Sequence, residues 1–231
     1  KFILTFDNGY FSEYSTFSAS DWIAQTQSQV LSKAFNLPAA VFSGFPKKEV
    51  YIALGKVPTE TAEQLTSKNP PPFTHKFSLG AQKPDVSKGG TFNYVDQKKF
   101  PISNTMSGAV LDIAPGAIRQ LHWHPNSDEW QYYIKGHARM TVFGAKGRKI
   151  TRDYGPGDVG YVPQGYGHYI ETVGDEHCEM LAVFNSGTYQ EITLAEWLRS
   201  TPRYLLETNF GVDPKIIDDI QKGKNLYSEP Q

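Results

Sequence analysis

The feature that most constrains this chain is a series of short apolar or alternating segments between residues 107 and 184, separated by turn-forming residues. The segments read SGAVLDIA, EWQYYIK, ARMTVF, VGYVP, HYIETV and EMLAVF, and the breaks contain APGA, KGH, GAKG and YGPGD. Short runs of this kind, interrupted by Gly, Pro and Asp, are typical of antiparallel strands joined by turns. So many strands in a short span avoid exposed edges by closing into a barrel or jelly roll. The sequence therefore predicts an all-β fold.

Charge and hydropathy exclude several classes of partner. The 231 residues include 23 Lys and Arg against 24 Asp and Glu, so the formal net charge of −1 provides no field that would gather nucleic acid or an anionic membrane. No run approaches the ~18 apolar residues that a membrane helix needs. The single cysteine, Cys178, excludes an intrachain disulfide and leaves the compartment open. We therefore expect neither nucleic acid nor a membrane as a partner.

Two segments outside the strand region have helical spacing instead. Residues 18–35 begin with Ser18, and residues 194–210 directly follow Thr193. Each of these two residues lies three before an acidic residue, which is a signal for the start of a helix. Pro202 is expected to end the first helix of the second segment. Residues 56–100 are rich in Pro, Lys, Ser and Thr and show little periodicity. They predict a linker with extended stretches rather than a packed domain.

An internal repeat links the two helical segments. FDNGYFSE at residues 6–13 matches FNSGTYQE at residues 184–191, and the match continues into both helices with Trp, Thr, Leu and Phe in the same order. The second copy follows a complete set of strands, whereas the first begins almost at residue 1. We therefore expect the C-terminal part of a duplicated two-barrel protein, or a descendant that lost most of its first barrel. The apolar residues 2–6, FILTF, would be the last strand of the absent barrel, pairing with another chain or fragment.

Three histidines and one glutamate have the spacing of a metal site. His122 and His124 are two residues apart, which on a strand points both side chains to one face, while Glu129 opens the next strand and His168 begins a later one. Three imidazoles and a carboxylate leave open positions on a six-coordinate metal, as a catalytic centre requires. The alternative is that they are ordinary polar residues of the barrel. Asp128 should point away from the metal, and four aromatic neighbours are expected to pack the barrel: Trp123, Tyr132, Tyr133 and Phe143.

The same residues fit two motifs and a wider resemblance. The pattern G-x5-H-x-H-x4-E-x6-G runs from Gly116 to Gly136, and G-x5-P-x-G-x2-H runs from Gly157 to His168; both resemble the cupin motifs. The runs PGAIRQLHWHPNSDEWQYYIKGHARMTVF and GDVGYVPQGYGHYIE resemble the C-terminal cupin of the oxalate decarboxylases, particularly the fungal branch. FDNGYFSEYSTFSASDWIAQT resembles the segment that closes the N-terminal cupin of these two-cupin enzymes. The resemblance covers nearly the whole chain and implies a cupin fold, that is, a double-stranded β-helix or jelly-roll barrel with short flanking helices.

The resemblance implies a division of the chain into four parts. These are the last strand, lid and helices of a mostly missing N-terminal cupin (1–55), a linker and extended arm (56–100), the C-terminal cupin barrel (101–187) and a helical tail (188–231). We expect a homo-oligomer, a trimer or hexamer as in the family, or association with the missing N-terminal cupin fragment. The reason is a set of apolar tail residues outside the barrel that need a partner surface: Leu194, Trp197, Leu198, Leu205, Leu206 and Phe210. Resemblance to fungal members favours a secreted protein.

Individual residues take expected roles from the same resemblance. His122, His124, Glu129 and His168 match the manganese ligands of the family. Arg119 matches the arginine that orients and polarises the bound oxalate; its alternative is a solvated charge on the barrel. Imidazole and carboxylate donors suit Mn(II) or Fe(II), and the ligands alone leave the metal open.

Two glutamates are candidates for proton transfer. Glu13, in the run Ser12, Glu13, Tyr14 and Ser15, matches the mobile lid that carries the proton donor of the N-terminal cupin. In bacterial members the C-terminal cupin has a glutamate in its last strand, but the matching residue here is Ala182. Glu191, the repeat partner of Glu13, is a candidate to replace that carboxylate.

Three functions follow as hypotheses. The first is decarboxylation of oxalate to formate and carbon dioxide at a manganese cupin site, with dioxygen as co-catalyst. The second is oxidation of oxalate with release of hydrogen peroxide, and the third is a non-enzymatic storage or binding cupin. The complete ligand set favours an enzyme, whereas Ala182 leaves open a site that is structural, substrate-binding or weakly catalytic.

Overall fold

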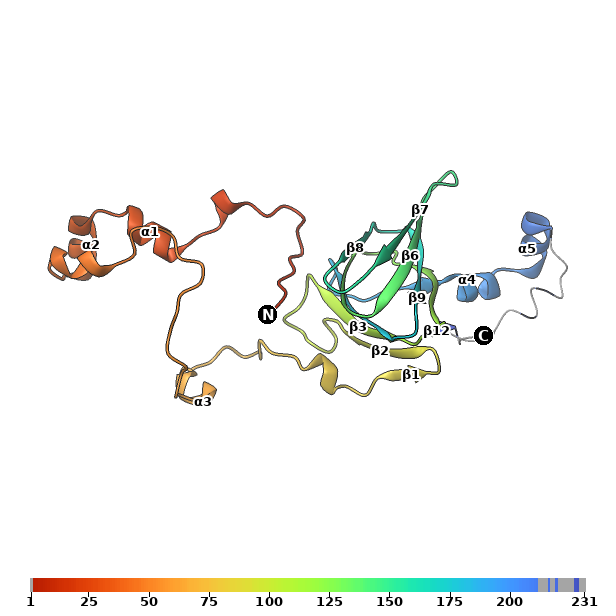
Figure 1. The fold of residues 1–231 in the computed structure, drawn as a ribbon, viewed down its shortest axis with the longest axis horizontal. Coiled ribbons are helices and arrows are strands. Elements are labelled where there is room, and N and C mark those ends of the chain that lie inside the picture. The colour runs from red at the N-terminus through yellow and green to blue at the C-terminus, as the bar shows by residue number, and fades with distance from the viewer. Residues whose placement is uncertain (1, 212–215, 217–218, 220–226, 229–231) are drawn as a thin grey trace. The chain divides into compact units, whose positions relative to one another are not determined.

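The computed structural model describes residues 2–211, 216, 219 and 227–228, except the side chains of Glu13 and of the last two (Figure 1). The chain divides into two compact units, one formed by Lys1–Asp7 with Pro72–Gln231 and the other by Asn8–Pro71. In the described part of the chain, no helix combines the length and the apolar character needed to cross a lipid bilayer.

The first unit is built from two antiparallel sheets, which confirms the predicted all-β fold. One sheet has the strand order β1 (Asp85–Ser87), β2 (Gly90–Val95), β3 (Ser107–Ile113), β10 (Cys178–Phe184), β5 (Glu129–Lys135) and β8 (Val159–Val162). The other has the order β11 (Ile192–Thr193), β4 (Ile118–Trp123), β9 (Gly167–Val173), β6 (His137–Phe143) and β7 (Lys149–Tyr154), with β12 (Tyr227–Ser228) also paired to β4. Figure 1 shows these strands gathered into one barrel. Strands distant in sequence, such as β3 and β10, therefore become neighbours.

Alternation along the strands creates the core between the two sheets. In β3 and β10 every second residue is buried, as expected when one face of a strand points inward. These inward residues are mostly aliphatic or aromatic and form one cluster that includes Leu111, Ile113, Tyr133, Met140, Ile170 and Met180. The polar candidate site is embedded in this apolar interior.

Two expected boundaries of the barrel are wrong. The first sheet begins at β1, so the barrel starts before residue 101 and takes in the end of the predicted linker. Phe92 of β2 is buried and Tyr94 packs against the same core, but an alternation of two residues is too short to reveal a strand next to the Pro-, Lys- and Ser-rich segment. The predicted helical tail likewise contributes β11 and β12, which add to the edge of β4.

The expected strand at residues 2–6 is absent from this chain. These residues form no strand, and Phe2 and Leu4 are 82% and 67% exposed. A strand requires a neighbouring strand, and residues 2–6 take part in none of the strand pairings found among the described residues. Pairing with another chain or fragment therefore stays a prediction.

The helices follow the predicted start signals but divide differently. The segment 18–35 is not one helix: α1 (Ala19–Gln25) ends at Thr26, and α2 (Ser28–Phe35) follows. The second segment forms α4 (Leu194–Ser200) and α5 (Arg203–Phe210), separated at Pro202 as predicted. Shorter elements are η1 (Glu13–Ser15), η2 (Ala39–Gly44), α3 (Ala62–Leu65) and η3 (Leu79–Ala81).

The internal repeat is visible in local hydrogen bonds. Ser18 and Thr193, which are matched by the repeat, each cap a helix by accepting a bond from the backbone N–H three residues later. The matched Thr26 and Thr201 each end a helix and donate their hydroxyl to the carbonyl of a matched tryptophan, at 2.6 and 2.8 Å. The two copies therefore share a helix–break–helix structure.

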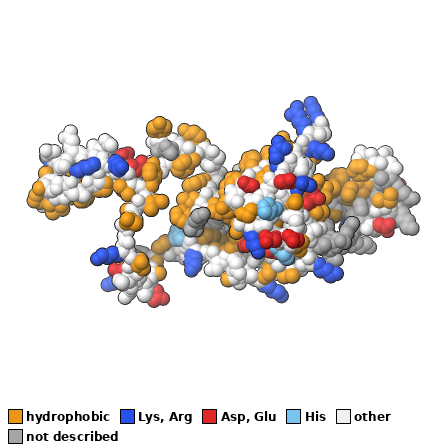
Figure 2. Space-filling view, in the orientation of Figure 1, with side chains coloured by type: hydrophobic (Ala, Val, Ile, Leu, Met, Phe, Trp, Pro, Cys, Tyr) orange, Lys and Arg blue, Asp and Glu red, His pale blue; other side chains and the backbone are white. Residues whose placement is uncertain are grey.

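The Asn8–Pro71 unit has only a small core. Phe42 and Leu31 are buried in it, and the Phe42 ring packs against Phe35 and Phe45. Figure 2 shows hydrophobic side chains over the surface of this unit, in agreement with exposed Trp22 and Ile52. Apolar surface of this extent is typical of a segment that packs against a further protein surface.

Candidate metal centre

The four predicted ligands converge inside the barrel. His122 lies on β4 and His124 directly follows that strand, while Glu129 begins β5 and His168 lies in β9 opposite His122. All four are only 2–3% exposed. One potential ligand atom from each lies within 4.8 Å of those of the other three. The four side chains thus meet at one place, as a shared ion would require, rather than lying separately along the barrel.

Turns position the ligands on their strands. Gly116 and Gly136, which bracket the first motif, have φ values of 72° and 69°. This left-handed region strongly favours glycine, and a Cβ on Gly136 would come within 2.2 Å of the His177 carbonyl oxygen. The glycines of the motif thus fix the chain reversals before β4 and after β5.

A β-bulge in β4 adds Arg119 to the same interior. Arg119 precedes His122 by three residues, a spacing that places two side chains on opposite faces of a regular strand. The pairing with β9 shifts between these residues: Arg119 lies opposite Ile170, and His122 lies opposite His168. The extra residue in β4 turns both side chains inward, and Arg119 is only 2% exposed. The alternative of a solvated arginine is therefore wrong.

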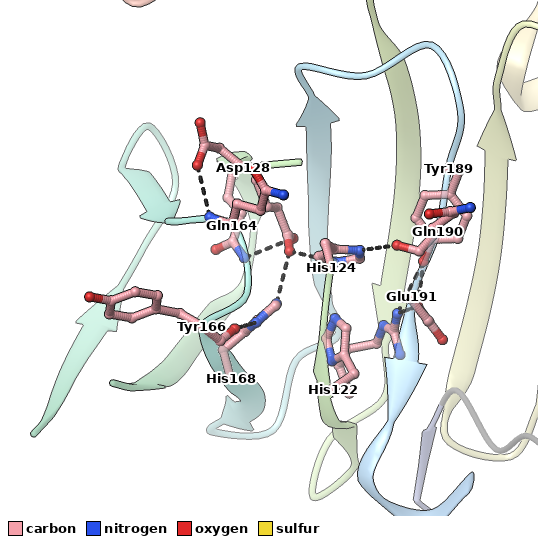
Figure 3. Close-up of polar contacts among 12 residues, drawn as sticks. His122, His124, Asp128, Gln164, Tyr166, His168, Tyr189, Gln190 and Glu191 are labelled. Carbon is pink, nitrogen blue, oxygen red and sulfur yellow. Dashed lines mark hydrogen bonds and ion pairs between the residues drawn. The ribbon is translucent and has the colours of Figure 1, made fainter. Parts of the chain in front are cut away.

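Backbone carbonyls orient the histidine rings. The Nδ1 atoms of His122, His124 and His168 lie 2.6, 2.7 and 3.3 Å from the carbonyl oxygens of Gln120, Gln190 and Tyr166. A carbonyl only accepts, so each Nδ1 carries a proton, and Nε2 is the ring nitrogen left to bind a metal. Figure 3 shows the His124–Gln190 and His168–Tyr166 contacts. Metal-binding histidines are commonly held in this way.

Glu129 meets two of these histidines at one point. Its Oε2 atom lies 3.0 Å from His124 Nε2 and 2.8 Å from His168 Nε2. All three atoms are buried and have no hydrogen-bond partner. Two donors about 2.1 Å from one ion and at right angles to each other would lie about 3 Å apart. The donor set and its spacing therefore fit a divalent metal ion.

The pKa values of two ligands favour the forms that bind metal. Burial lowers the pKa of His122 well below its ordinary value, and the nearby Arg119 guanidinium adds to this effect, so the ring is neutral. Burial alone would raise the pKa of Glu129, but the positive charge and N–H groups that the His168 and His124 rings present to it in the absence of metal outweigh burial and hold the pKa well below the ordinary value. One carboxylate and neutral imidazoles would leave a divalent ion with net positive charge.

A second polar group lies beside the ligands. Arg119 Nη2 donates to Glu191 Oε2 in a buried ion pair, and the Tyr189 hydroxyl donates to the same oxygen (Figure 3). Burial raises the pKa of Tyr189 well above its ordinary value, so the hydroxyl keeps its proton. The Tyr189 ring packs against those of Phe184 and His124. Glu191 is thus held in the interior next to the candidate ligands.

Other predicted residues lie apart from the ligand group. Asp128 accepts bonds from the Gln164 backbone N–H and the Asn185 side chain, both at 2.8 Å, so it is not a ligand, as predicted. Ala182 is buried in β10 and offers no polar atom. Glu13 belongs to the Asn8–Pro71 unit, and its expected role stays a prediction.

The packing expectation holds for only some of the aromatic residues. Tyr133 is fully buried in the core, but Phe143 lies on the outward side of β6 and is 54% exposed. Tyr189 and Gln131 belong to neither motif, although both contact residues of the predicted site. Alternation would have placed Gln131 on the inward face of β5, together with Glu129.

Comparison with known proteins agrees with this site. The family model described as cupin matches residues 77–218, more than half of the chain. The chain is 39% identical over 229 residues to oxalate decarboxylase OxdC of Bacillus subtilis, covering 97% of this chain and 59% of that protein. It is 34% identical to a probable oxalate decarboxylase of Arthroderma benhamiae, covering 97% of this chain and 56% of that protein.

Solved structures give the same result. A structure of Bacillus subtilis oxalate decarboxylase, studied for its Mn(II) centres, matches with a TM-score of 0.89 and 36% identity, covering 97% of this chain and 60% of the other. The chain thus spans about three fifths of the length of these relatives, and the predicted resemblance to oxalate decarboxylases is confirmed. The fold, the two motifs and the family match agree: the chain belongs to the cupin family.

Proposed function

We propose that this chain carries the metal site of an oxalate decarboxylase, which converts oxalate into formate and carbon dioxide. The observation that carries the proposal is the buried group of three histidines and one glutamate with Arg119 beside it. The similarity to oxalate decarboxylases along 97% of the chain supports the choice of substrate.

Manganese is the proposed metal, held by His122, His124, Glu129 and His168. Neutral imidazole and carboxylate donors suit Mn(II), and a relative of known structure has Mn(II) centres. When bound, the ion would supply Lewis acidity and one-electron redox chemistry, with dioxygen as the proposed co-catalyst.

Arg119 is proposed to hold the substrate. Its guanidinium pairs with the Glu191 carboxylate in this structure, which supports binding of a carboxylate at the same place. A small anion such as oxalate would also be attracted by the positive charge of the loaded centre. The buried position of Arg119 strengthens this attraction, because little water screens it.

Glu191 is the proposed proton donor. Decarboxylation breaks the carbon–carbon bond of oxalate, releases carbon dioxide and requires one proton at the remaining carbon to form formate. A substrate carboxylate on Arg119 would deprive Glu191 of its cationic partner, which favours the protonated form of a buried carboxyl group. Glu191 would then take the role of the glutamate that bacterial members have at the position of Ala182. The Tyr189 hydroxyl would hold its Oε2 atom.

The Asn8–Pro71 unit is proposed to be the end of a second cupin. It carries the first copy of the internal repeat, and the relatives extend beyond the matched region. Glu13 is proposed as the proton donor of that second site, whose ligands are not found among the described residues of this chain.

The test is product analysis of the Mn(II)-loaded chain supplied with oxalate, with and without dioxygen. Formate without equivalent peroxide supports the proposal, peroxide without formate indicates an oxidase, and no product from a loaded protein indicates a binding cupin. Glu191→Gln should reduce formate production about 10²- to 10⁴-fold. Glu176→Gln, at an exposed position, is the matched control and should leave the rate unchanged.

A further inference from the structure

A buried chain of hydrogen bonds leads from the candidate metal centre along β5. Glu129, Gln131 and Tyr133 are alternate residues of this strand, and their side chains point into the barrel. Gln131 Nε2 donates to Glu129 Oε1 at 2.9 Å, and the Tyr133 hydroxyl donates to Gln131 Oε1 at 2.8 Å. Gln131 and Tyr133 are both fully buried. We call these three residues the β5 relay.

The chemistry of its members fixes the direction of the β5 relay. An ionised Glu129 only accepts hydrogen bonds, so the amide nitrogen of Gln131 must face it. The amide oxygen then faces Tyr133, whose hydroxyl must donate. Burial raises the pKa of Tyr133 far above its ordinary value, so this donor keeps its proton.

The neighbouring residues hold the relay in place. Gly160 of β8 lies opposite Gln131, and a Cβ at residue 160 would come within 2.7 Å of Gln131 Oε1. The Tyr133 ring stacks on Tyr154, with ring centroids 4.7 Å apart and planes inclined by 15°. A side chain at residue 160 would therefore displace the Gln131 amide from this position.

We infer that Gln131 and Tyr133 are positioning residues that set how Glu129 binds the metal. Gln131, itself held by Tyr133, occupies Glu129 Oε1, so that Oε2, the atom beside His124 and His168, is the oxygen presented to the ion. A carboxylate with both oxygens free can bind a divalent ion through both. That mode would fill a coordination position that a small carboxylate ligand requires. This inference rests on the proposed metal site.

Two substitutions in the full chain test the inference with Mn(II) as the probe. Gln131→Leu removes the relay with little change in volume, and Tyr133→Phe removes only the terminal hydroxyl. Mn(II) affinity is measured by competition with a chelator, and the bound ion is examined by electron paramagnetic resonance. Tyr132→Phe is the matched control, because strand alternation turns that tyrosine to the opposite face.

Gln131→Leu is expected to weaken Mn(II) binding about 10- to 100-fold, and Tyr133→Phe about threefold. Both variants should show an altered zero-field splitting of the bound Mn(II). Tyr132→Phe should change neither the affinity nor the spectrum. Affinity and spectrum equal to the wild type in both variants would overturn the inference while leaving the metal site intact. Failure of the wild-type chain to bind Mn(II) would instead overturn the proposed site. If Gln131→Leu does not fold, Tyr133→Phe decides the result.

Discussion

Removal of the Glu191 carboxylate should strongly destabilise the barrel. The side chains of Arg119 and Glu191 are 2% and 0% exposed, so their ion pair is almost completely shielded from water. Taking away one partner of such a pair removes a direct charge–charge contact from a buried group, at a cost of about 3–5 kcal/mol. For a chain of 231 residues, this corresponds to a fall of about 6–20 °C in the melting temperature. We therefore expect Glu191→Ala to unfold at markedly lower temperature and urea concentration, measured without metal.

A double-mutant cycle separates this pair from general damage. Arg119→Met should also be destabilising because it leaves Glu191 buried, whereas the double variant should lose much less than the two single losses added together. The exposed pair Arg139–Asp153 has a 2.7 Å contact and serves as the control, so Asp153→Ala should leave the unfolding midpoint unchanged. If Glu191→Ala is as stable as Asp153→Ala, or if the single losses simply add, the buried pair does not contribute as described.

Three further predictions concern metal binding, the thiol and assembly. Mn(II) at about 100 times its dissociation constant should stabilise the barrel by about 2.7 kcal/mol, which raises the melting temperature by about 5–10 °C. The same rise in the variant His168→Ala would show that His168 does not bind the ion. Burial raises the pKa of the Cys178 thiol to about 12, so iodoacetamide at pH 8 should label it only after unfolding, and rapid labelling of the folded chain would be inconsistent with this burial. Trp197 and Phe210 are 40% and 50% exposed, so we expect an oligomer to form through this surface. The double variant Trp197→Ser, Phe210→Ser should be a smaller species in light scattering. A monomeric wild type would refute the expectation.

The fold was largely predictable because alternation and turn residues carry local information. Six of the eight strands from β3 to β10 follow the predicted segments, and the first motif indicates a seventh, β4, through its histidines. β7 was missed, because its residues are almost all exposed and its sequence shows no alternation. The weak points were elements whose formation depends on partners. In β2 the inward alternation covers only Phe92 and Tyr94, and residues 2–6 would form a strand only if another segment paired with them.

The candidate ligands were predictable, whereas the groups around them depend on tertiary structure. A regular strand would place Arg119 and His122 on opposite faces, and only the pairing with β9 reveals the bulge that brings them together. Arg119 and Glu191 are far apart in sequence, so no local pattern could show their ion pair. The apolar tail illustrates the same limit: Leu206 was expected at a partner surface but is buried within this chain at 2% exposure.

The most direct measurement is anomalous diffraction at the manganese absorption edge from crystals of the Mn(II)-loaded chain. We expect one peak inside the barrel, about 2 Å from the three histidine Nε2 atoms and from Glu129 Oε2. A peak bound by other side chains, or no peak among these four in a loaded crystal, would show that the four residues do not bind one ion.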